Sequence, residues 1–340
     1  MSGTFGIKAI GSSLGERFAL KDVVENYTNN PDRVFAWGYE HVYIASKNKT
    51  QTELAVEAAK EAIKKADIQA EELDVIILSI SDIPEYLYWD SAASLQHQLG
   101  AKNAEVILLT QACTGGLASF ELMAGKLSVN SDYKNGLLVM SNKCCEPYRN
   151  RATYNASFRS DGAVAAVVQR DYPKSKWLSS KNFTDGTYNE LFKLDVGGEV
   201  EPFSSENVNK ISSYSTLAQL RSFFASDPLG LMDLTELIHR RNREMTEQAC
   251  EKAGITLSKL SKIIYLHDNQ DSLKTLARHF EIPLEKTNAL LSIQYGHMGV
   301  VDQLYDYSLY LESNELESGD YIALVGFGSG MHWMATILQV

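Results

Sequence analysis

The chain has 340 residues, of which 44% are hydrophobic and 22% charged, a composition typical of a globular protein with a large buried core. Its 32 lysines and arginines against 43 aspartates and glutamates give a net charge of −11, which disfavours a nucleic-acid partner. No apolar stretch reaches the length of a membrane span and the first residues lack the layout of a signal peptide, so we expect a soluble cytoplasmic protein without membrane contact.

The predicted elements come in pairs along the chain. Residues 52–80 predict a helix, a polar turn and a buried strand, and residues 245–267 predict the same order. Further pairs are the helices 91–99 and 273–280, the strands 105–111 and 288–294, the helices 117–128 and 300–313, the strands 136–140 and 321–325, and the strands 163–169 and 333–340. In the first pair of segments, matched positions are separated by a constant number of residues. This constant offset favours two copies of one βα-rich unit over two unrelated α/β lobes.

This pattern predicts two halves, residues 1–170 and 171–340. Residues 171–225 do not fit the repeat, because they are rich in Lys, Ser, Asn and Gly. We expect them to form an irregular insertion, with loops or a cover over a cavity.

Cys113 stands out among the four cysteines, which include no CxxC pair and no histidine at metal-ligand spacing. It lies between a predicted buried strand and a predicted helix, in the sequence QACTGG. The partial positive charge of a helix N-terminus stabilises a thiolate there. Cys113 is therefore either a nucleophile or a buried structural cysteine, and we expect no metal and no cofactor.

Two histidines occupy comparable junctions. His267 ends the predicted strand of the second repeat, and His297 lies at the duplicate of the cysteine junction. One cysteine and two histidines at strand ends suggest thiol chemistry with imidazole assistance. The late glycine-rich run GFGSGMHW leads into a strand rather than a helix, which disfavours a dinucleotide site and favours backbone N–H groups that face an oxyanion.

Together these motifs resemble a known family. The segments IKAIGSSLGE, GYEHVYIAS, AAKEAIKKADIQAEELDVIILSIS, QACTGG, SDGAVAAVV, HDNQ and GDYIALVGFGSGMHW are similar to those of the β-ketoacyl-acyl-carrier-protein synthase III family, over nearly the whole chain. The resemblance implies an α/β thiolase-like fold with two pseudo-symmetric halves in a layered α/β/α/β/α arrangement.

The resemblance also implies roles for individual residues. Cys113 corresponds to the acylated nucleophile and His267 to the first catalytic histidine, while the N–H groups of Cys113 and Gly330 would form the oxyanion hole. His297 stands where the family usually has asparagine, which gives a Cys-His-His set. Asp302, five residues further on, either orients His297 as a triad carboxylate does or is a surface charge, and the sequence favours the surface charge.

The implied reaction is acylation of Cys113 followed by decarboxylative Claisen condensation with a malonyl-type thioester, in specialised polyketide or fatty-acid-like biosynthesis. As an alternative, His297 acts as a base on an incoming hydroxyl or amine and the acyl group is transferred without condensation. A third hypothesis is a non-catalytic partner subunit.

By the same resemblance, we expect an acyl-coenzyme A or acyl-carrier-protein thioester as donor, a carrier protein as partner, and a homodimer. The basic cluster Arg240, Arg241 and Arg243 either docks an acidic carrier or is a solvated helix face. The candidate substrate-binding residues are Trp37, Arg151, Asn269 and Tyr88, the last in an aromatic loop expected near the dimer interface and the acyl tunnel.

Overall fold

The computed structural model describes residues 4–152, 157–207, 209–210 and 216–340. In this part of the chain, a mixed sheet is built from β1 (Phe5–Leu14), β4 (Val75–Ile80), β5 (Glu105–Leu109), β6 (Asn135–Asn142), β7 (Gly162–Arg170), β8 (Lys176–Thr184), β9 (Leu260–Ile264), β10 (Tyr321–Gly328) and β11 (His332–Gln339). Two further strands, β2 (Glu16–Ala19) and β3 (His41–Ile44), pair with each other.

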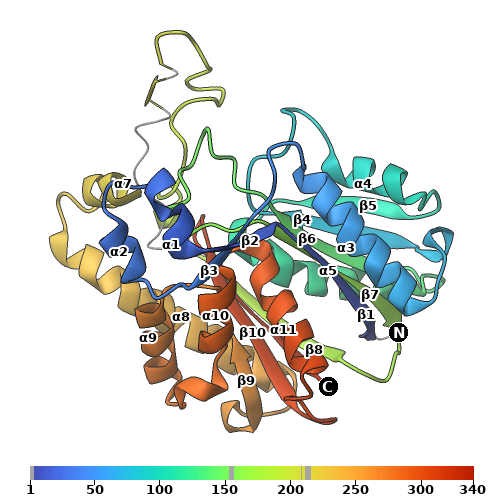
Figure 1. Ribbon diagram of the computed structural model, residues 1–340. Coiled ribbons are helices and arrows are strands. Elements are labelled where there is room, and N and C mark those ends of the chain that lie inside the picture. Colours follow the sequence, from blue (N-terminus) through green and yellow to red (C-terminus); the bar gives the residue numbers. More distant parts are fainter. Residues whose placement is uncertain (1–3, 153–156, 208, 211–215) are drawn as a thin grey trace.

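Helices cover both faces of this sheet (Figure 1). They are α1 (Leu20–Val23), α2 (Pro31–Phe35), α3 (Gln51–Ala66), α4 (Ser91–Leu99), α5 (Gly115–Val129), α7 (Thr216–Phe223), α8 (Pro228–Lys252), α9 (Gln270–Phe280), α10 (Ala289–Tyr295) and α11 (Asp302–Glu312). No helix among the described residues combines the length and apolar character that a bilayer crossing requires.

The strand order repeats in the two halves. Outward from the middle of the sheet, β1-β7-β6-β4-β5 on one side corresponds to β8-β11-β10-β9 on the other. The two sides meet where Gly6 of β1 pairs with Lys176 of β8. This repeated order supports the proposed division into residues 1–170 and 171–340.

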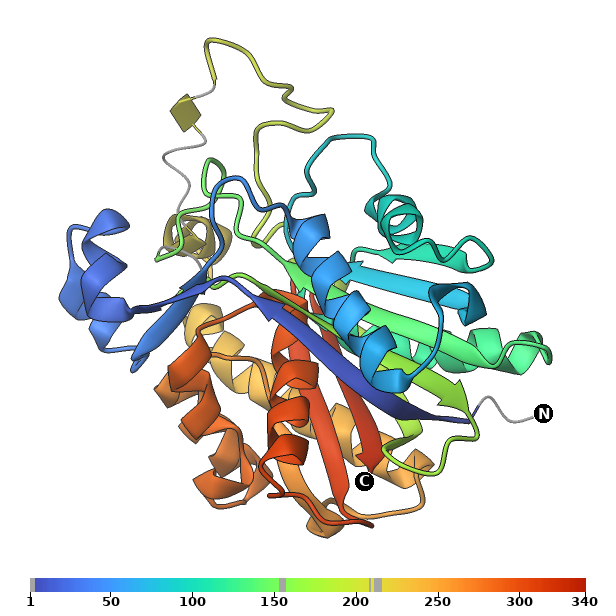
Figure 2. The same cartoon turned by 45° about the vertical axis from the view of Figure 1, so that its right-hand side comes forward.

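The apolar clusters define the layers. One cluster packs α3 and α4 on the first set of strands, another packs α8 and α9 on the second set, and a third joins α5 and α11 to strands of both sets. The helices α5 and α11 therefore form the middle layer of an α/β/α/β/α arrangement, with α3 and α8 on opposite sides (Figure 2). Because α5 is buried between the two sets of strands, Leu117, Phe120 and Met123 are all inaccessible.

The predicted strand 288–294 is wrong, because the structure forms α10 there. The side chain of Asn288 accepts a hydrogen bond from the N–H of Tyr265 at 2.9 Å and donates to its carbonyl at 2.8 Å. A side chain thus takes the hydrogen bonds that a further strand would have made. Only Thr287 bridges to β9, at Ile263, before the chain turns into the helix.

Residues 171–225 are less irregular than predicted. They contain β8, which pairs with β11 along most of its length, and the helix α7. The irregular part follows β8, and the loop around residues 195–207 projects from the body of the molecule (Figure 1).

Candidate active site

Cys113 lies on a short 3-10 turn, Ala112–Thr114, between β5 and the first residue of α5. The turn is tight, because Ala112 has a φ of 45°. A Cβ on Gly116 would stand only 2.6 Å from the carbonyl oxygen of Val300, so glycine there lets the loop before α11 approach closely. The first turn of α5 and the start of α11 are thus brought together at the thiol.

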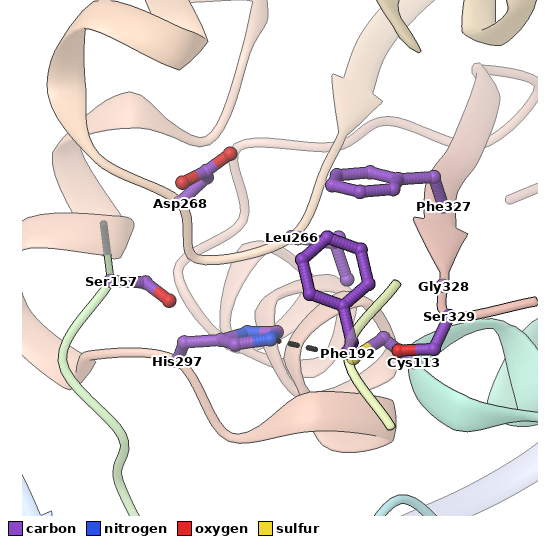
Figure 3. Close-up of a pocket in the computed structure, with 9 residues that line it drawn as sticks. All are labelled: Cys113, Ser157, Phe192, Leu266, Asp268, His297, Phe327, Gly328 and Ser329. Atoms are coloured by element: carbon purple, nitrogen blue, oxygen red, sulfur yellow. Dashed lines mark hydrogen bonds between the residues drawn. The ribbon is translucent and has the colours of Figure 1, made fainter. Parts of the chain in front are cut away.

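Cys113, His297 and Asp302 form one hydrogen-bonded chain. The Sγ of Cys113 lies 3.5 Å from Nε2 of His297, and Nδ1 of His297 lies 2.6 Å from Oδ2 of Asp302 (Figure 3). The other oxygen of Asp302 accepts the backbone N–H of Met298 at 2.7 Å. Asp302 is fully buried, so the expectation that it is a surface charge was wrong. The geometry is that of a nucleophile, a base and a carboxylate that orients the base.

The electrostatics favour a thiolate beside an imidazolium. Burial acts to raise the pKa of Cys113, but the charge and hydrogen bond of His297 outweigh it, and the pKa is lowered. Burial acts to lower the pKa of His297, but Asp302 and Cys113 raise it to about 9. His297 in turn helps to hold the pKa of Asp302 below its ordinary value against the effect of burial. The thiolate form of Cys113 is therefore more accessible than that of an ordinary cysteine.

The interaction between Cys113 and His297 makes the reactivity of the Cys113 thiol dependent on the histidine. We expect iodoacetamide to alkylate Cys113 in the wild-type protein at pH values well below those that an ordinary thiol requires. In His297→Gln the imidazolium is lost while burial remains, so the alkylation profile should move to higher pH. Mass spectrometry of Cys113 across a pH series measures this shift, and superimposed profiles for the two proteins would contradict the ion pair.

His267 requires a correction, because it does not line the cavity at Cys113. It is completely buried, with Nδ1 2.8 Å from the carbonyl oxygen of Gly296 and Nε2 2.8 Å from Oδ1 of Asp306. Both nitrogens face acceptors, so both carry hydrogens and neither is left for a substrate. Burial acts to lower the pKa of His267, but Asp306 and Asp302 raise it to about 9. His267 therefore lies behind Cys113, His297 and Asp302, where it can position other groups but does not face the cavity.

A small, partly open cavity lies beside the thiol. It is lined by Cys113, Ser157, Phe192, Leu266, Asp268, His297, Phe327, Gly328 and Ser329. Asp268, Ser157 and His297 stand on one side, opposite Phe327 and the glycine-rich turn (Figure 3). Because Phe192 comes from the segment after β8, that segment does contribute to the covering of the cavity.

The glycine-rich turn approaches the thiol at Gly328. A Cβ on Gly328 would lie 3.0 Å from the backbone nitrogen of Cys113, so only glycine fits without displacement. Gly330 does not line the cavity, and a Cβ there would meet the ring of His332 at 2.4 Å. The oxyanion role expected for Gly330 therefore stays a prediction, and Gly328 and Ser329 are the residues of this turn at the cavity.

A second cavity adjoins the first and shares Phe192, Asp268 and Phe327 with it. It is larger than the first and open to solvent, and it lies between α7, α8 and the start of α9. Asn269, a predicted substrate-binding residue, lines this second cavity and caps α9, accepting the N–H of Ser272 at 2.9 Å.

Two other predicted substrate-binding residues make structural contacts. Trp37 is buried in the apolar cluster around α1 and α2 and lines neither cavity. Arg151 is also buried and forms two hydrogen bonds to Asp161, at 2.9 and 2.8 Å, and an ion pair with Glu146 at 2.6 Å. These contacts occupy its guanidinium. Neither residue lines either of the two cavities, and the substrate-binding role expected of both stays a prediction.

Tyr88 lies on a solvent-exposed loop and lines neither cavity of this protomer. Its neighbours Tyr86 and Leu87 are also exposed. The basic cluster is partly neutralised, because Arg240 and Arg241 share Glu244 and Arg243 pairs with Glu247 and Glu281. Its expected role in carrier docking stays a prediction.

The sequence reasoning missed Asp268 and Phe192 as cavity residues. Asp268 directly follows His267, so its place after a buried strand was a usable signal, whereas nothing near Phe192 in the sequence indicated a site. Among the described residues, no group of three or more histidine, cysteine or acidic side chains is arranged to hold a metal.

The fold is thiolase-like, with a cysteine, a histidine and an aspartate in one hydrogen-bonded chain at a cavity, and the comparisons with known proteins specify the protein further. Residues 250–340 match the family model described as 3-oxoacyl-[acyl-carrier-protein] synthase III C terminal. Over 340 residues the chain is 28% identical to β-ketoacyl-[acyl-carrier-protein] synthase III of Syntrophomonas wolfei, covering 98% of this chain and 96% of the relative.

Solved structures agree with this result. The acyltransferase ChlB3 superimposes with a TM-score of 0.86 at 20% identity, covering 99% of this chain and 98% of the other. The 3-oxoacyl-[acyl-carrier-protein] synthase III of Aquifex aeolicus does so with a TM-score of 0.78 at 24% identity, covering 99% and 100%. The chain is thus similar to 3-oxoacyl-[acyl-carrier-protein] synthase III proteins over nearly its whole length and shares their thiolase fold, which confirms the expected resemblance and fold class.

Proposed function

We propose that Cys113 takes an acyl group from a thioester and that His297 then activates the acceptor of this group. The observation that carries the proposal is the continuous chain Cys113–His297–Asp302 at the cavity. In the first step the thiolate attacks the thioester carbonyl, the carbon–sulfur bond to the donor breaks, and His297 gives its proton to the leaving thiolate. The product is acyl-Cys113 beside a neutral imidazole.

The geometry best supports transfer of the acyl group to a hydroxyl or amine. Neutral His297 accepts the proton of the nucleophile as its oxygen or nitrogen bonds to the acyl carbon, and the bond to Sγ of Cys113 breaks. Asp302 stabilises the imidazolium that forms. A single imidazole is sufficient for this step, and a single imidazole, that of His297, lines the cavity in the described part of the chain.

Decarboxylative Claisen condensation is the second candidate, and the relatives favour it. The curated relatives carry the name of a condensing enzyme over nearly the full chain, which supports a ketosynthase III-like acyltransferase and condensation with a malonyl-type thioester, as predicted. This reaction forms an enolate that two N–H donors would stabilise. In neutral His297 the N–H of Nδ1 donates to Asp302 and Nε2 is an acceptor, and His267 does not line the cavity, so neither ring offers such an N–H donor.

For the donor we propose an acyl thioester of coenzyme A or of an acyl carrier protein, with the second cavity as the path of its thiol arm. Such donors are cytoplasmic, and we propose the same location for this enzyme. We also propose a homodimer, because β5 is the last strand of the sheet and the exposed residues Tyr86, Leu87 and Tyr88 lie on the same half of the molecule.

The first experiment tests the acylation of Cys113. The protein is incubated with S-acetyl-pantetheine, and the mass of the intact chain is measured. We expect one acetyl group on the wild-type protein and none on Cys113→Ala. Acetylation of the alanine variant to the same extent would contradict the role of Cys113.

The acetylated enzyme is then mixed with malonyl-pantetheine, or with a panel of simple alcohols and amines. Transfer without carbon dioxide release supports the hydroxyl or amine acceptor, whereas carbon dioxide release with a ketoacyl product establishes condensation and contradicts the leading candidate.

A further inference from the structure

Asp268 lies where the two cavities join. Its side chain lines both of them, together with Phe192 and Phe327. The carboxylate stands on the same side of the catalytic cavity as His297, across from Phe327 (Figure 3). An acceptor that enters through the second cavity and reaches acyl-Cys113 therefore passes this carboxylate.

Three donors hold the Asp268 carboxylate in place. Oδ1 accepts the N–H of Asn269 at 2.8 Å and its side-chain N–H at 3.1 Å, and Oδ2 accepts the hydroxyl of Ser272 at 2.6 Å. Burial raises the pKa of Asp268 above its ordinary value, although these hydrogen bonds and His297 act in the opposite direction. The carboxylate is thus a fixed acceptor, oriented by the first turn of α9.

The charged residues that line the catalytic cavity are Asp268 and His297, and His297 becomes neutral once Cys113 is acylated. The charge of Arg159, which lies outside this lining, also acts on Cys113 and His297. Once His297 is neutral, ionised Asp268 gives the lining a net negative charge. A carboxylate on the acceptor would be repelled, and a hydroxyl or an ammonium would be accepted.

The second cavity has groups that suit an uncharged polar ligand. Nδ1 of His239 and Oγ1 of Thr216 are buried in its wall and make no hydrogen bond within the described structure. Burial lowers the pKa of His239 to about 4, so its ring is neutral. Buried polar atoms of this kind are ordinarily satisfied, and a ligand with hydroxyl or amide groups satisfies them here.

We propose that Asp268 selects the acceptor, admitting neutral or cationic molecules with a hydroxyl or amine and disfavouring anionic ones, malonyl groups included. This inference rests on the proposed function, in which acyl-Cys113 is discharged by such a nucleophile. It makes Asp268 a specificity-determining residue, in addition to the triad.

Two alkylating reagents of similar size test the selection directly. Iodoacetamide is neutral and iodoacetate is anionic, and both react with the thiolate of Cys113. The ratio of their rates cancels any change in the thiolate fraction. We expect Asp268→Asn, which keeps the shape of the side chain, to raise the rate of iodoacetate relative to iodoacetamide about tenfold. The control Asp195→Asn removes an exposed carboxylate outside both cavities and should leave the ratio within twofold of the wild-type value.

A second readout uses acetyl-Cys113 and two matched acceptors, 3-hydroxypropionamide and 3-hydroxypropionate. The wild-type protein should discharge to the neutral acceptor faster, and Asp268→Asn should reduce this preference several-fold. An unchanged alkylation ratio in Asp268→Asn, or discharge to the anionic acceptor at the faster rate in the wild-type protein, overturns the inference. Failure of acetyl-Cys113 to form overturns the proposed function instead, and the alkylation ratio still reports on the charge of Asp268.

Discussion

Replacing His297 by asparagine is expected to lower the rate of acyl transfer by roughly 10²–10⁴-fold, the range for loss of a positioned general base. The variant restores the residue that the family usually carries at this position. It should nevertheless not restore the Cys-His-Asn chemistry of that family, because His267 lies behind the cavity and donates both ring hydrogens to Gly296 and Asp306. The rate of discharge of acetyl-Cys113 measures the effect.

Two observations keep this prediction testable. His279→Asn changes a histidine paired with Glu236 on the surface and should leave the discharge rate unchanged. Circular dichroism and thermal unfolding establish whether His297→Asn is folded. A folded variant that retains the wild-type rate would contradict the triad, and one that gains condensation with malonyl-pantetheine would show that His267 reaches the substrate after all.

Replacing His267 by phenylalanine is expected to lower the free energy of unfolding by about 3–5 kcal/mol, the usual cost of removing one partner of a buried ion pair. His267 lies between two fully buried carboxylates, Asp302 and Asp306. The backbone N–H of His267 also donates to Asp302 at 2.8 Å. The variant keeps this hydrogen bond but loses the positive charge of the imidazole ring. Urea unfolding at pH 7, with the exposed His97→Phe as control, measures the difference.

The same interaction makes stability depend on pH in a defined direction. Folding raises the pKa of His267 to about 9, from an ordinary value near 6.5. The protonated ring therefore stabilises the protein fully below about pH 6.5, and this contribution is lost as the pH rises through about 9. The wild-type protein should lose stability between pH 7 and 9.5, and His267→Phe should lose less. An equal loss in both proteins would contradict a charged His267.

Periodicity identified most of the fold, because helix and strand patterns and the pairing of segments are local properties of the chain. Residues 288–294 are the exception. Their apolar run suits either a short strand or a helix. The side chain of Asn288 decides between them, because it takes the backbone hydrogen bonds of Tyr265, the residue that follows β9. That contact joins residues 23 positions apart, and the apolar pattern around either residue gives no sign of it.

The candidate site was also predictable only in part from the sequence. The sequence by itself determined a cysteine at a strand-to-helix turn and a histidine at the duplicate junction, because a repeated unit places equivalent loops at one edge of a layered sheet. Only the tertiary structure decided the direction in which each imidazole points. The buried carboxylates Asp302 and Asp306 lie one helical turn apart on α11, so His267 is held between them while His297 is left facing the thiol. The charges that fix these rings come from α11. Their effect depends on burial, which exists only once the layers are packed.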